Sequence, residues 1–457
     1  MNGQAEEVDV DVVVVGAGAG GLTAALAAAD AGRSVVVLEK LERAGGNSAL
    51  STGSIPAAGT KQQREAGVDD DPERMTADLL RQSGAHEAER LTRRLSECSA
   101  EIVDWLINDH GIRLKLITDY KHVGHSVTRL HAPASRRGTD LVADLLAACE
   151  RAGIDVLLGN PVSSLLVENG QVRGVIVEGE RVDRYELRSH SVILASNGFG
   201  GNSALLEQWI PNLTKVEYFG AHGSTGEAIQ WGMDLGGYLE NQQAYQGYAA
   251  VAYPHGSIVS WTTVENGAIL VDSTGRRLGD ESVGYSGFTA EVLRGEAPIY
   301  VVYDTRIKHI AEKEEEFAEL VKMGGAEEYE SIQALAAGIH VDPDALSQTL
   351  DTYASAATGN SQDTFGRQDF GIAPLEAPYV ASRVTPGLFH TQGGLAVDEE
   401  GRVLTSDGTA LPGLFAIGGV AAGISGLQGG RGYSSGNGLL TAVGLGWLAG
   451  RATGSAA

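Results

Sequence analysis

The sequence is poor in cysteine, in basic residues and in long apolar runs. Its 457 residues include only two cysteines, too few for a disulfide framework or a cysteine-bound metal cluster. Basic residues number 34 against 59 acidic ones, and a surface with a net charge of −25 repels nucleic-acid phosphates and anionic lipid. No apolar run reaches the roughly 18 residues that span a bilayer. We therefore expect no nucleic-acid partner, no membrane insertion and no metal site.

The N-terminus also lacks the features of a targeting signal. The first residues, MNGQAEEVDVD, are acidic and show no basic-then-apolar pattern. Together with the scarcity of cysteine, this predicts a cytoplasmic protein. Hydrophobic residues make up 43% of the chain and charged residues 20%, a balance typical of a globular protein. Glycine, in contrast, is abundant with 62 residues, which indicates many places where the backbone closely approaches another group.

The N-terminal segment has the pattern of a βαβ unit. Residues 10–15 are an apolar, β-branched run typical of a strand buried on both faces. A glycine-rich turn at 16–21 follows, then an alanine-rich helix at 22–31 and a second buried strand at 34–38. Glu39 ends that strand. A strand, a glycine turn, a helix, a strand and a terminal acid in this order predict a dinucleotide-binding fold.

Each residue type in this unit has a physical role at a dinucleotide. Gly16 and Gly18 let the backbone pass beside a pyrophosphate, and Gly21 lets the helix and the strand pack closely. The N-terminus of the helix offers free amides to the phosphates. Glu39 accepts hydrogen bonds from a ribose.

The character of the chain changes twice. Residues 237–382 consist of aromatic, mixed β and loop segments followed by acidic helices, and a glycine-rich style returns after them. We interpret 237–382 as an inserted second domain, and 1–236 together with 383–457 as one discontinuous domain.

Five motifs in register resemble a known family. GAGAGG, GGNSALSTG, ASNGFGG, HTQGG and GLFAIGG…SSGNGLLTA occur in the order seen in the fumarate reductase and succinate dehydrogenase flavoprotein superfamily, which includes the 3-ketosteroid Δ1-dehydrogenases. The resemblance covers nearly the whole chain. It implies an α/β, Rossmann-like FAD-binding domain built from the two discontinuous segments, with an inserted α+β capping domain. It also implies FAD, bound either covalently or noncovalently. The absence of a histidine from the GGNS…STG loop favours noncovalent binding.

The resemblance places a set of residues against FAD. They lie in the glycine loops, at the end of the second strand and at the start of the last helix, whose N-terminal amides would stabilise the reduced flavin. The expected FAD-binding residues are Gly16, Gly18, Gly21, Glu39, Lys40, Gly46, Asn47, Ser48, Ser51, Gly53, Val162, Asn197, Gly198, Gly419, Gly436, Asn437, Leu439 and Leu440.

The residues that hold two carboxylates in fumarate reductases are missing. Where those enzymes carry a histidine before the HTxGG-like segment, this chain has Phe389, followed by His390. Tyr433 takes the place of an arginine near the last helix, and the arginine of a T-R-D segment is absent from residues 279–285. Dicarboxylate chemistry is therefore disfavoured.

The same replacements resemble the ketosteroid dehydrogenase branch. Its tyrosine base is matched by Tyr285, and its ketone-binding tyrosine by Tyr433, which acts with the backbone N–H of Asn437. Tyr120 is the nearest match to a tyrosine that relays the proton. The resemblance implies that the base removes a proton beside a ring ketone and that flavin N5 accepts a hydride from the next carbon.

Four further residues are candidates for substrate binding, each with a structural alternative. His390, next to Phe389, lies at the flavin edge or orders a glycine loop. Arg129 meets a substrate carboxylate, a carbonyl of the flavin site or a structural acid. Arg431 meets an anionic group of the substrate or lies on the surface of a glycine loop. An arginine in the pocket would suit a small cyclic keto acid such as 4-oxocyclohexanecarboxylate.

Three functions remain open at this point. The first is an FAD-dependent dehydrogenase that desaturates the C–C bond α,β to the ketone of a 3-ketosteroid or a smaller cyclic keto acid, with a quinone or another electron acceptor. The second is a fumarate-reductase-like reductase of an activated alkene, against which the missing arginines count. The third is a noncatalytic flavoprotein subunit of an electron-transfer complex.

Overall fold

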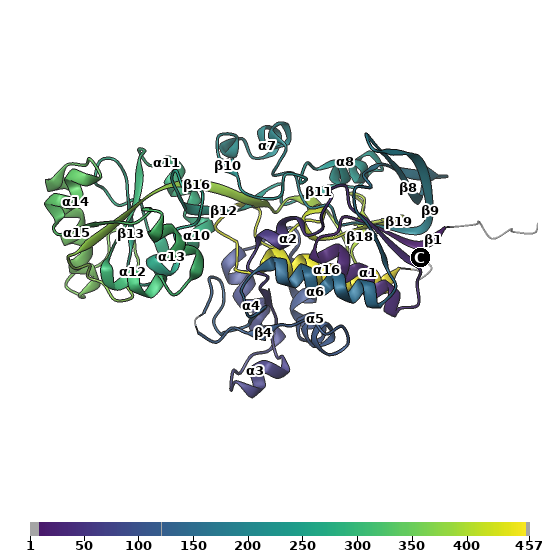
Figure 1. The fold of residues 1–457 in the computed structure, drawn as a ribbon, viewed down its shortest axis with the longest axis horizontal. Coiled ribbons are helices and arrows are strands. Elements are labelled where there is room, and N and C mark those ends of the chain that lie inside the picture. Colours follow the sequence, from purple (N-terminus) through teal and green to yellow (C-terminus); the bar gives the residue numbers. More distant parts are fainter. Residues whose placement is uncertain (1–8, 120, 454–457) are drawn as a thin grey trace, which may run out of the picture. The chain divides into compact units, whose positions relative to one another are not determined.

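A computed structural model of the protein describes residues 9–119 and 121–453. These residues divide into two units (Figure 1). The first unit runs to Tyr245 and also contains His390–Gln428 and the chain from Gly432 onward, and the second contains Gln246–Phe389 and Gly429–Arg431. Within the described ranges, no helix has the length and apolar character needed to cross a membrane.

The main sheet of the first unit contains the expected βαβ unit. β1 (Val10–Val15) pairs in parallel with β2 (Val35–Leu38) on one side and with β9 (Val182–Leu194) on the other. Val13 and Val14 have no exposed surface, as expected for an apolar strand inside a parallel sheet. The other strands of this sheet are β6 (Asp155–Leu157), β7 (Val162–Glu168), β8 (Gln171–Gly179), β18 (Arg402–Leu404) and β19 (Ala410–Ala416).

Two helices pack along each other on this sheet without intervening side chains. α1 (Ala19–Asp30) starts inside the glycine run, earlier than the predicted helix, because Gly20 and Gly21 form its first turn. α16 (Asn437–Ala452) lies alongside α1 (Figure 1), and a Cβ at Gly446 would lie 2.5 Å from the Gly20 carbonyl oxygen. A Cβ at Gly450, one turn further along α16, would overlap the Ala24 carbonyl oxygen, one turn further along α1, so the two helices run in the same direction.

The remaining elements of the first unit are short or lie outside the main sheet. A three-stranded sheet is formed by β3 (Ile55–Pro56), β4 (Lys115–Leu116) and β5 (Leu130–Ala132), and β11 (Leu239–Glu240) pairs with β17 (Gly394–Leu395). The helices are α2 (Gly46–Leu50), α3 (Lys61–Glu65), α4 (Pro72–Ser83), α5 (Glu89–Asn108), α6 (Gly138–Arg151), α7 (Ser203–Trp209) and α8 (Glu227–Asp234).

The second unit is built on antiparallel strands and short helices. β14 (Ile299–Asp304) pairs with β13 (Ile269–Val271) and β16 (Tyr379–Thr391), and β12 (Gln243–Ala252) and β16 each run across a boundary between the units. The other elements are β15 (Glu327–Tyr329), β20 (Gln428–Gly429), α9 (Thr262–Glu265), α10 (Gly284–Gly287), α11 (Thr289–Arg294), α12 (Thr305–Ala311), α13 (Glu315–Lys322), α14 (Ile332–Gly338) and α15 (Pro343–Ala357).

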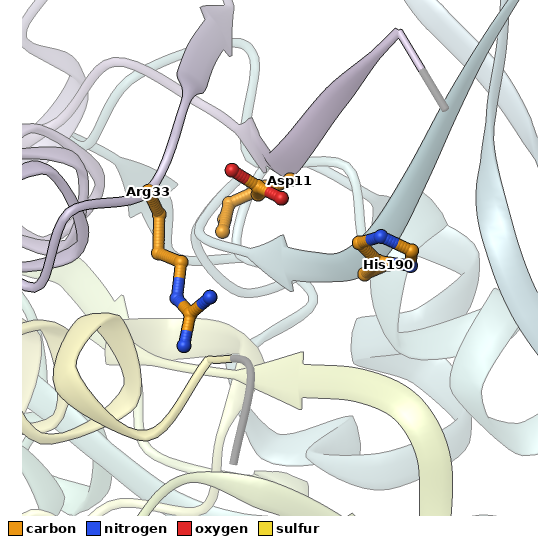
Figure 2. Close-up of a pocket in the computed structure, with 4 residues that line it drawn as sticks. Asp11, Arg33 and His190 are labelled. Carbon is orange, nitrogen blue, oxygen red and sulfur yellow. The ribbon is translucent and has the colours of Figure 1, made fainter. Parts of the chain in front are cut away.

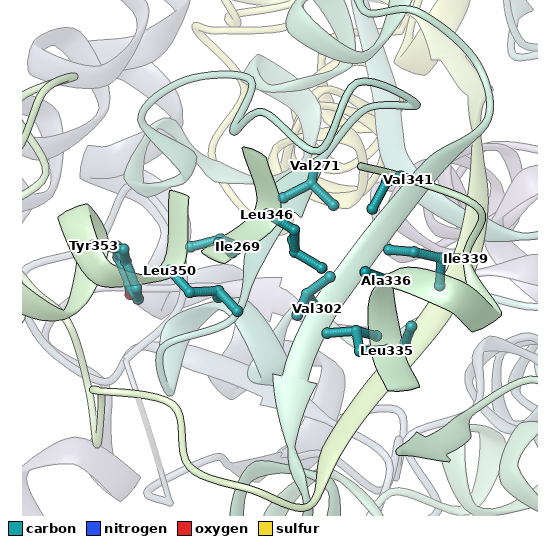
Figure 3. Close-up of a cluster of buried hydrophobic side chains, with 11 residues drawn as sticks. Ile269, Val271, Val302, Leu335, Ala336, Ile339, Val341, Leu346, Leu350 and Tyr353 are labelled. Carbon is teal, nitrogen blue, oxygen red and sulfur yellow. The ribbon is translucent and has the colours of Figure 1, made fainter. Parts of the chain in front are cut away.

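The core of the second unit lies between its strands and its last two helices. Figure 3 shows Ile269 and Val302 on the strands pointing toward Leu335 of α14 and Leu346 of α15. Ile269, Val302, Leu335 and Leu346 are fully buried, so this unit has a hydrophobic core of its own.

The observed architecture confirms the predicted α/β class with a Rossmann-like domain made of discontinuous segments. The second unit starts at Gln246 and ends at Phe389, and it gains residues 429–431 from the C-terminal part of the chain. The predicted insertion, 237–382, therefore overlaps this unit for most of its length. Its assignment as a cap over the flavin stays a prediction.

Candidate functional site

The glycines of the first loop differ in whether the packing of the protein itself requires them. Gly16 has φ +112°, and a Cβ there would lie 2.6 Å from the Ala195 carbonyl oxygen, so this glycine is required by β9. A Cβ at Gly21 would overlap the Gly16 carbonyl oxygen, which agrees with the predicted close packing of helix on strand. At Gly18 the nearest atom is 3.6 Å away. Of these three glycines, only Gly18 could carry a Cβ at ordinary van der Waals distances from the rest of the protein, so the protein's own packing does not require a glycine there.

The two helices that meet this edge begin after glycines, which have no side chain to cap them. Gly18 precedes α1 and Gly436 precedes α16, and neither helix has an acidic residue in its first turn. The first N–H groups of a helix have no partner within it and carry partial positive charge. Other helices of the chain satisfy them with the side chains of Asp71, Asn202, Asp304 and Asp342. Uncapped N-termini fit an anionic or carbonyl-bearing ligand.

Glu39 ties the end of β2 to the glycine loop. Its Oε2 accepts a hydrogen bond from the Ala17 N–H at 2.9 Å, and its Oε1 accepts one from the Leu41 N–H at 2.9 Å. The carboxylate keeps acceptor capacity for a ribose hydroxyl. Lys40 behaves differently, because its Nζ lies 2.9 Å from Glu227 Oε1 and is paired with that carboxylate.

The second predicted loop contacts the start of α1. Ser48 Oγ accepts a hydrogen bond from the Ala19 N–H at 3.1 Å, and Asn47 Oδ1 accepts one from the Ala221 N–H at 2.6 Å. Ser51 Oγ donates to the Ser48 carbonyl at 2.8 Å and accepts from the Gly53 N–H at 3.0 Å. The loop that begins at Gly46, in α2, is therefore held in place beside the glycine turn.

A third group of predicted residues meets around Gly419. A Cβ at Gly419 would lie 2.7 Å from the Gly198 N and 2.9 Å from His390 Nε2, and it would overlap Asn197 Oδ1. Asn197 has φ +70°, which turns the chain sharply after β9. Burial lowers the pKa of His390 to about 4, so its imidazole is neutral near pH 7. Val162, at the start of β7, is half-buried.

Among the residues that the structure describes, five buried side-chain oxygens of the first unit have no hydrogen-bond partner, and three of them lie in the predicted motifs. These three are Gln392 Oε1, Ser434 Oγ and Asn437 Oδ1. The amide nitrogens of the two amide side chains are satisfied, since Gln392 Nε2 donates to His390 Nδ1 at 2.8 Å and Asn437 Nδ2 to Ser425 Oγ at 3.3 Å. Unpaired buried acceptors are costly and are normally satisfied by a ligand or water. A flavin pyrimidine ring, with an N–H between carbonyls, suits such a set.

Tyr433 and Asn437 lie together at the start of α16. Tyr433 is 5% exposed, and its hydroxyl lies 3.7 Å from the position of a Cβ on Gly438. The Asn437 N–H, predicted to bind the substrate ketone with Tyr433, donates instead to the Ser434 carbonyl at 3.1 Å. That N–H is therefore engaged by the turn that begins the helix. Leu439 and Leu440, in the same first turns, are 8% and 1% exposed.

Tyr285 lies in the second unit, in a cluster of aromatic rings. Its ring stacks on Tyr248 with centroids 5.0 Å apart, and Tyr248 stacks on Phe389 at 5.5 Å. The Trp261 ring meets Tyr248 edge-on at 6.2 Å. The Tyr248 hydroxyl donates to the Val259 carbonyl and accepts from the Trp261 N–H, both at 3.1 Å. Tyr248 is thus held rigidly and supports the Tyr285 ring.

Arg129 and Arg431, both predicted to bind substrate, lie in other surroundings than a substrate-binding residue would. A third predicted residue, Tyr120, is not described by the structure. Arg129 has no exposed surface and pairs with Asp70 at 2.8 Å and with Asp78 at 2.9 Å, the structural-acid alternative. Arg431 belongs to the second unit, with a side chain 69% exposed and 3.8 Å from Glu291.

The motifs did not indicate every residue of this arrangement. The sequence did not single out Gln392 and Ser434 as functional residues, although Gln392 lies inside HTQGG and Ser434 directly follows Tyr433. A polar residue inside a glycine motif was the available signal.

A separate pocket lies at the other end of β1. Figure 2 shows Asp11, Arg33 and His190 around a cavity of about 270 Å³, which Val12 also lines. Asp11 is near the start of β1, so this cavity is at the amino end of the strand. Ligands of parallel α/β sheets bind beyond the carboxyl ends of the strands. None of the predicted site residues lines this pocket.

Comparisons with known proteins show the family of the chain. The FAD binding domain family matches residues 11–435. NADH:fumarate oxidoreductase of Klebsiella pneumoniae (strain 342) is 31% identical over 410 residues, which cover 89% of this chain and 44% of that protein. Fumarate reductase (cytochrome) of Shewanella frigidimarina is 30% identical over 435 residues, which cover 94% of this chain and 74% of that protein. The chain thus spans less than half the length of the Klebsiella relative.

Solved structures with the same fold include both a reductase and a dehydrogenase. The open conformation of a flavocytochrome c3 fumarate reductase matches with a TM-score of 0.79 at 28% identity, over 97% of this chain and 77% of that chain. The 3-ketosteroid delta1-dehydrogenase from Sterolibacterium denitrificans matches with a TM-score of 0.79 at 21% identity, over 96% of this chain and 98% of that chain. At this identity the match shows a similar fold and no more. The comparisons confirm FAD as the cofactor and the predicted class, an FAD-dependent oxidoreductase.

Proposed function

The chain belongs to the FAD binding domain family, in which it is related to fumarate reductases. We propose that it desaturates the C–C bond α,β to the ketone of a cyclic substrate. The observation that carries the proposal is Tyr433, a buried phenol at the uncapped start of α16. A neutral hydroxyl there donates to a ketone oxygen and stabilises the enolate that forms when the neighbouring carbon loses a proton.

The second unit supplies the other features that the reaction needs. Tyr285 is the proposed base, and the Tyr248, Phe389 and Trp261 rings around it form an apolar cluster that excludes water. Tyrosine titrates near pH 10 in water, so Tyr285 acts as a base when a neighbouring hydroxyl stabilises its phenolate, the role proposed for Tyr120. When bound, FAD supplies the hydride acceptor.

The residues present do not favour a dicarboxylate substrate. Arg129 is already paired with Asp70 and Asp78, and Phe389 takes the place of a carboxylate-binding histidine. Arg431 stays a candidate for a carboxylate at the far end of a small cyclic keto acid, because its side chain is largely exposed. We therefore propose 3-ketosteroids and 4-oxocyclohexanecarboxylate as the first substrates to test.

The test is anaerobic mixing of the holoenzyme with each ketone. Bleaching of the flavin absorbance, with formation of the α,β-unsaturated ketone, is the expected result. Tyr433→Phe should lower the rate of bleaching by about a hundredfold or more, since it removes one oxyanion donor. Tyr253→Phe is the matched control, because Tyr253 is 50% exposed in the second unit and should react like the wild type. Absence of bleaching with every cyclic ketone would refute the proposal.

A second candidate function is reduction of an activated alkene, the reverse type of reaction. The sequence identity to fumarate reductases favours it. It predicts that fumarate, urocanate or acrylate reoxidises the chemically reduced enzyme at a catalytic rate. An unsaturated cyclic ketone that reoxidises the enzyme while these acids do not would favour the first function instead.

A third candidate is a flavoprotein component that only passes electrons within a longer protein or complex. The chain covers 44% of the Klebsiella relative, which leaves room for additional domains in such an assembly. It predicts that Tyr433→Phe leaves electron transfer to an acceptor, a quinone or a cytochrome, unchanged.

A further inference from the structure

The loop that carries Tyr433 is held from behind by the segment 123–125. His125 Nε2 donates to the Ser435 carbonyl at 2.8 Å, and the Ser435 N–H donates to the Val123 carbonyl at 3.0 Å. A Cβ on Gly124 would overlap the Ser434 side chain, so the two segments are in direct contact. All of these residues belong to the first unit. One histidine therefore bonds to the backbone two residues after Tyr433.

The neighbouring Arg129 determines which ring nitrogen of His125 carries the proton. Arg129 Nη1 lies 3.3 Å from His125 Nδ1, and because a guanidinium only donates, Nδ1 must accept. The imidazole proton then sits on Nε2, where it faces the Ser435 carbonyl. Burial and the nearby Arg129 lower the pKa of His125 to about 4, so the ring stays in this neutral tautomer near pH 7.

Arg129 is itself fixed by two carboxylates. Asp70 binds its Nε at 3.0 Å and its Nη2 at 2.8 Å, and Asp78 lies 2.9 Å from Nη1. The acids are also satisfied on their other sides, since Gln63 Nε2 donates to Asp70 at 2.9 Å and the Ser126 N–H donates to Asp78 at 2.8 Å. The cluster is a rigid, fully bonded anchor on which the His125 ring rests.

We infer that His125 is a positioning residue for the Tyr433 loop, and that it holds the Ser435 carbonyl and thereby directs the Tyr433 hydroxyl at the start of α16. The effect on catalysis rests on the proposed function, in which that hydroxyl binds the ketone. The anchoring itself is a property of the fold and is measured without any substrate.

The experiment compares three holoenzyme variants. His125→Gln keeps a donor near the position of Nε2, His125→Asn carries the same amide on a shorter side chain that does not reach Ser435, and His125→Leu removes the donor. Hydrogen exchange, followed by mass spectrometry, should be faster in peptides that cover 433–437 for the Asn and Leu variants and close to wild type for Gln. His86→Leu is the matched control, because His86 is also buried in the first unit, beside Thr92.

Turnover gives the second readout. With a ketone that the wild type desaturates, kcat should fall roughly tenfold to a hundredfold in His125→Asn while KM and FAD affinity change little, because a misplaced donor mainly affects the transition state. His125→Gln should recover most of the loss.

The outcomes separate this inference from the proposed function. Equal exchange at 433–437 in wild type, Gln and Asn variants would overturn it, as would an Asn variant with wild-type kcat. If no cyclic ketone is turned over, the proposed function fails while the exchange measurement still decides the role of His125. If His125→Leu does not fold, the Gln and Asn variants give the answer.

Discussion

The two units differ in how the buried polar groups near their candidate site residues are satisfied. In the first unit, the oxygens of Gln392, Ser434 and Asn437 are buried with no partner among the described residues, and α1 and α16 begin after glycines, which have no side chain to cap them. In the second unit, Glu281 is fully buried and binds Arg277 at 2.6 Å and Arg367 at 3.2 Å. At the start of α16 the first unit thus leaves buried acceptors that a ligand can satisfy, whereas the second unit pairs the buried charges around Glu281 internally.

The second unit surrounds this cluster with aromatic rings. Arg277 also binds Asp363, and its guanidinium lies 4.9 Å from the centre of the Tyr353 ring. Glu281 directly precedes the turn that carries Tyr285. The paired cluster therefore supports the backbone of the proposed base, much as the Arg129 cluster supports the loop of Tyr433 in the first unit.

The largest expected effect comes from breaking the paired cluster of the second unit. Arg277→Leu leaves Glu281 and Asp363 buried without their cation, so the free energy of unfolding should fall by about 3–5 kcal/mol. Arg276→Leu, at the exposed neighbouring position, should change it little. Urea denaturation of both variants measures the difference. Equal stability of the two variants would show that the cluster contributes no more than a surface charge.

The free energy of unfolding should depend on pH in different directions in the two units. Burial lowers the pKa of His390 to about 4 and, beside Arg129, that of His125 to about 4. Since free histidine titrates near 6.5, the unfolded chain takes up these protons first, and stability falls as the pH drops from about 6.5 toward 4. From pH 7 to 5 the first unit should lose up to about 2 kcal/mol per histidine.

The stability of the second unit should change with pH in the opposite direction over the same pH range. Burial, with help from Glu314 and Asp369, raises the pKa of Glu265 to about 7. The folded state then holds this proton while the unfolded chain releases it, so stability falls as the pH rises from about 4.5 to 7. The effect should be small because Glu265, although crowded by protein atoms, keeps part of its surface in contact with solvent, which screens its charge. Pulse proteolysis in urea at pH 5 and 7, with fragments assigned to each unit, tests both directions; a first unit that is more stable at pH 5 contradicts them.

The smallest effects come from the helix starts. Gly18→Ala places a methyl group where the protein leaves space, so the free protein should keep its stability while FAD binding weakens by about tenfold. Asp342→Ala removes the acceptor of the Ala345 N–H at 2.9 Å and should cost about 1 kcal/mol of stability with no change in FAD affinity. Thermal melts and FAD titration of both variants measure the contrast. A Gly18→Ala protein with wild-type FAD affinity would show that this N-terminus does not face the cofactor.

Much of the first unit could be predicted from short-range patterns. The strand 10–15, the glycine turn and the strand that ends at Glu39 are recognisable because each depends on neighbouring residues. The predicted start of the first helix was less accurate, because Gly20 and Gly21 belong to α1 and not to the preceding turn. Glycine there serves packing against α16, a contact between segments that are far apart in the chain.

The site residues divide in the same way. Gly18, Glu39 and Ser48 could be placed beside a dinucleotide from their motif, and the structure puts them around one helix N-terminus. Arg129 could not be assigned, because its partner Asp70 is 59 residues away and no local pattern pairs them. The Asn437 N–H was expected to face a substrate, yet it closes a turn with Ser434, a bond that depends on the local path of the chain.

By itself, the amino-acid sequence determined a dinucleotide-binding fold, because glycine loops, buried strands and a terminal acid act through their immediate neighbours. The resemblance of its five motifs to a known family then indicated FAD as the dinucleotide. Only the tertiary structure decided which charged and polar groups are already satisfied. Arg129 is neutralised by Asp70 and Asp78, and Tyr285 is stacked on Tyr248. The physical reason is that burial and pairing depend on segments brought together by folding, and a hydrogen bond or an ion pair exists only where both partners arrive in reach of each other.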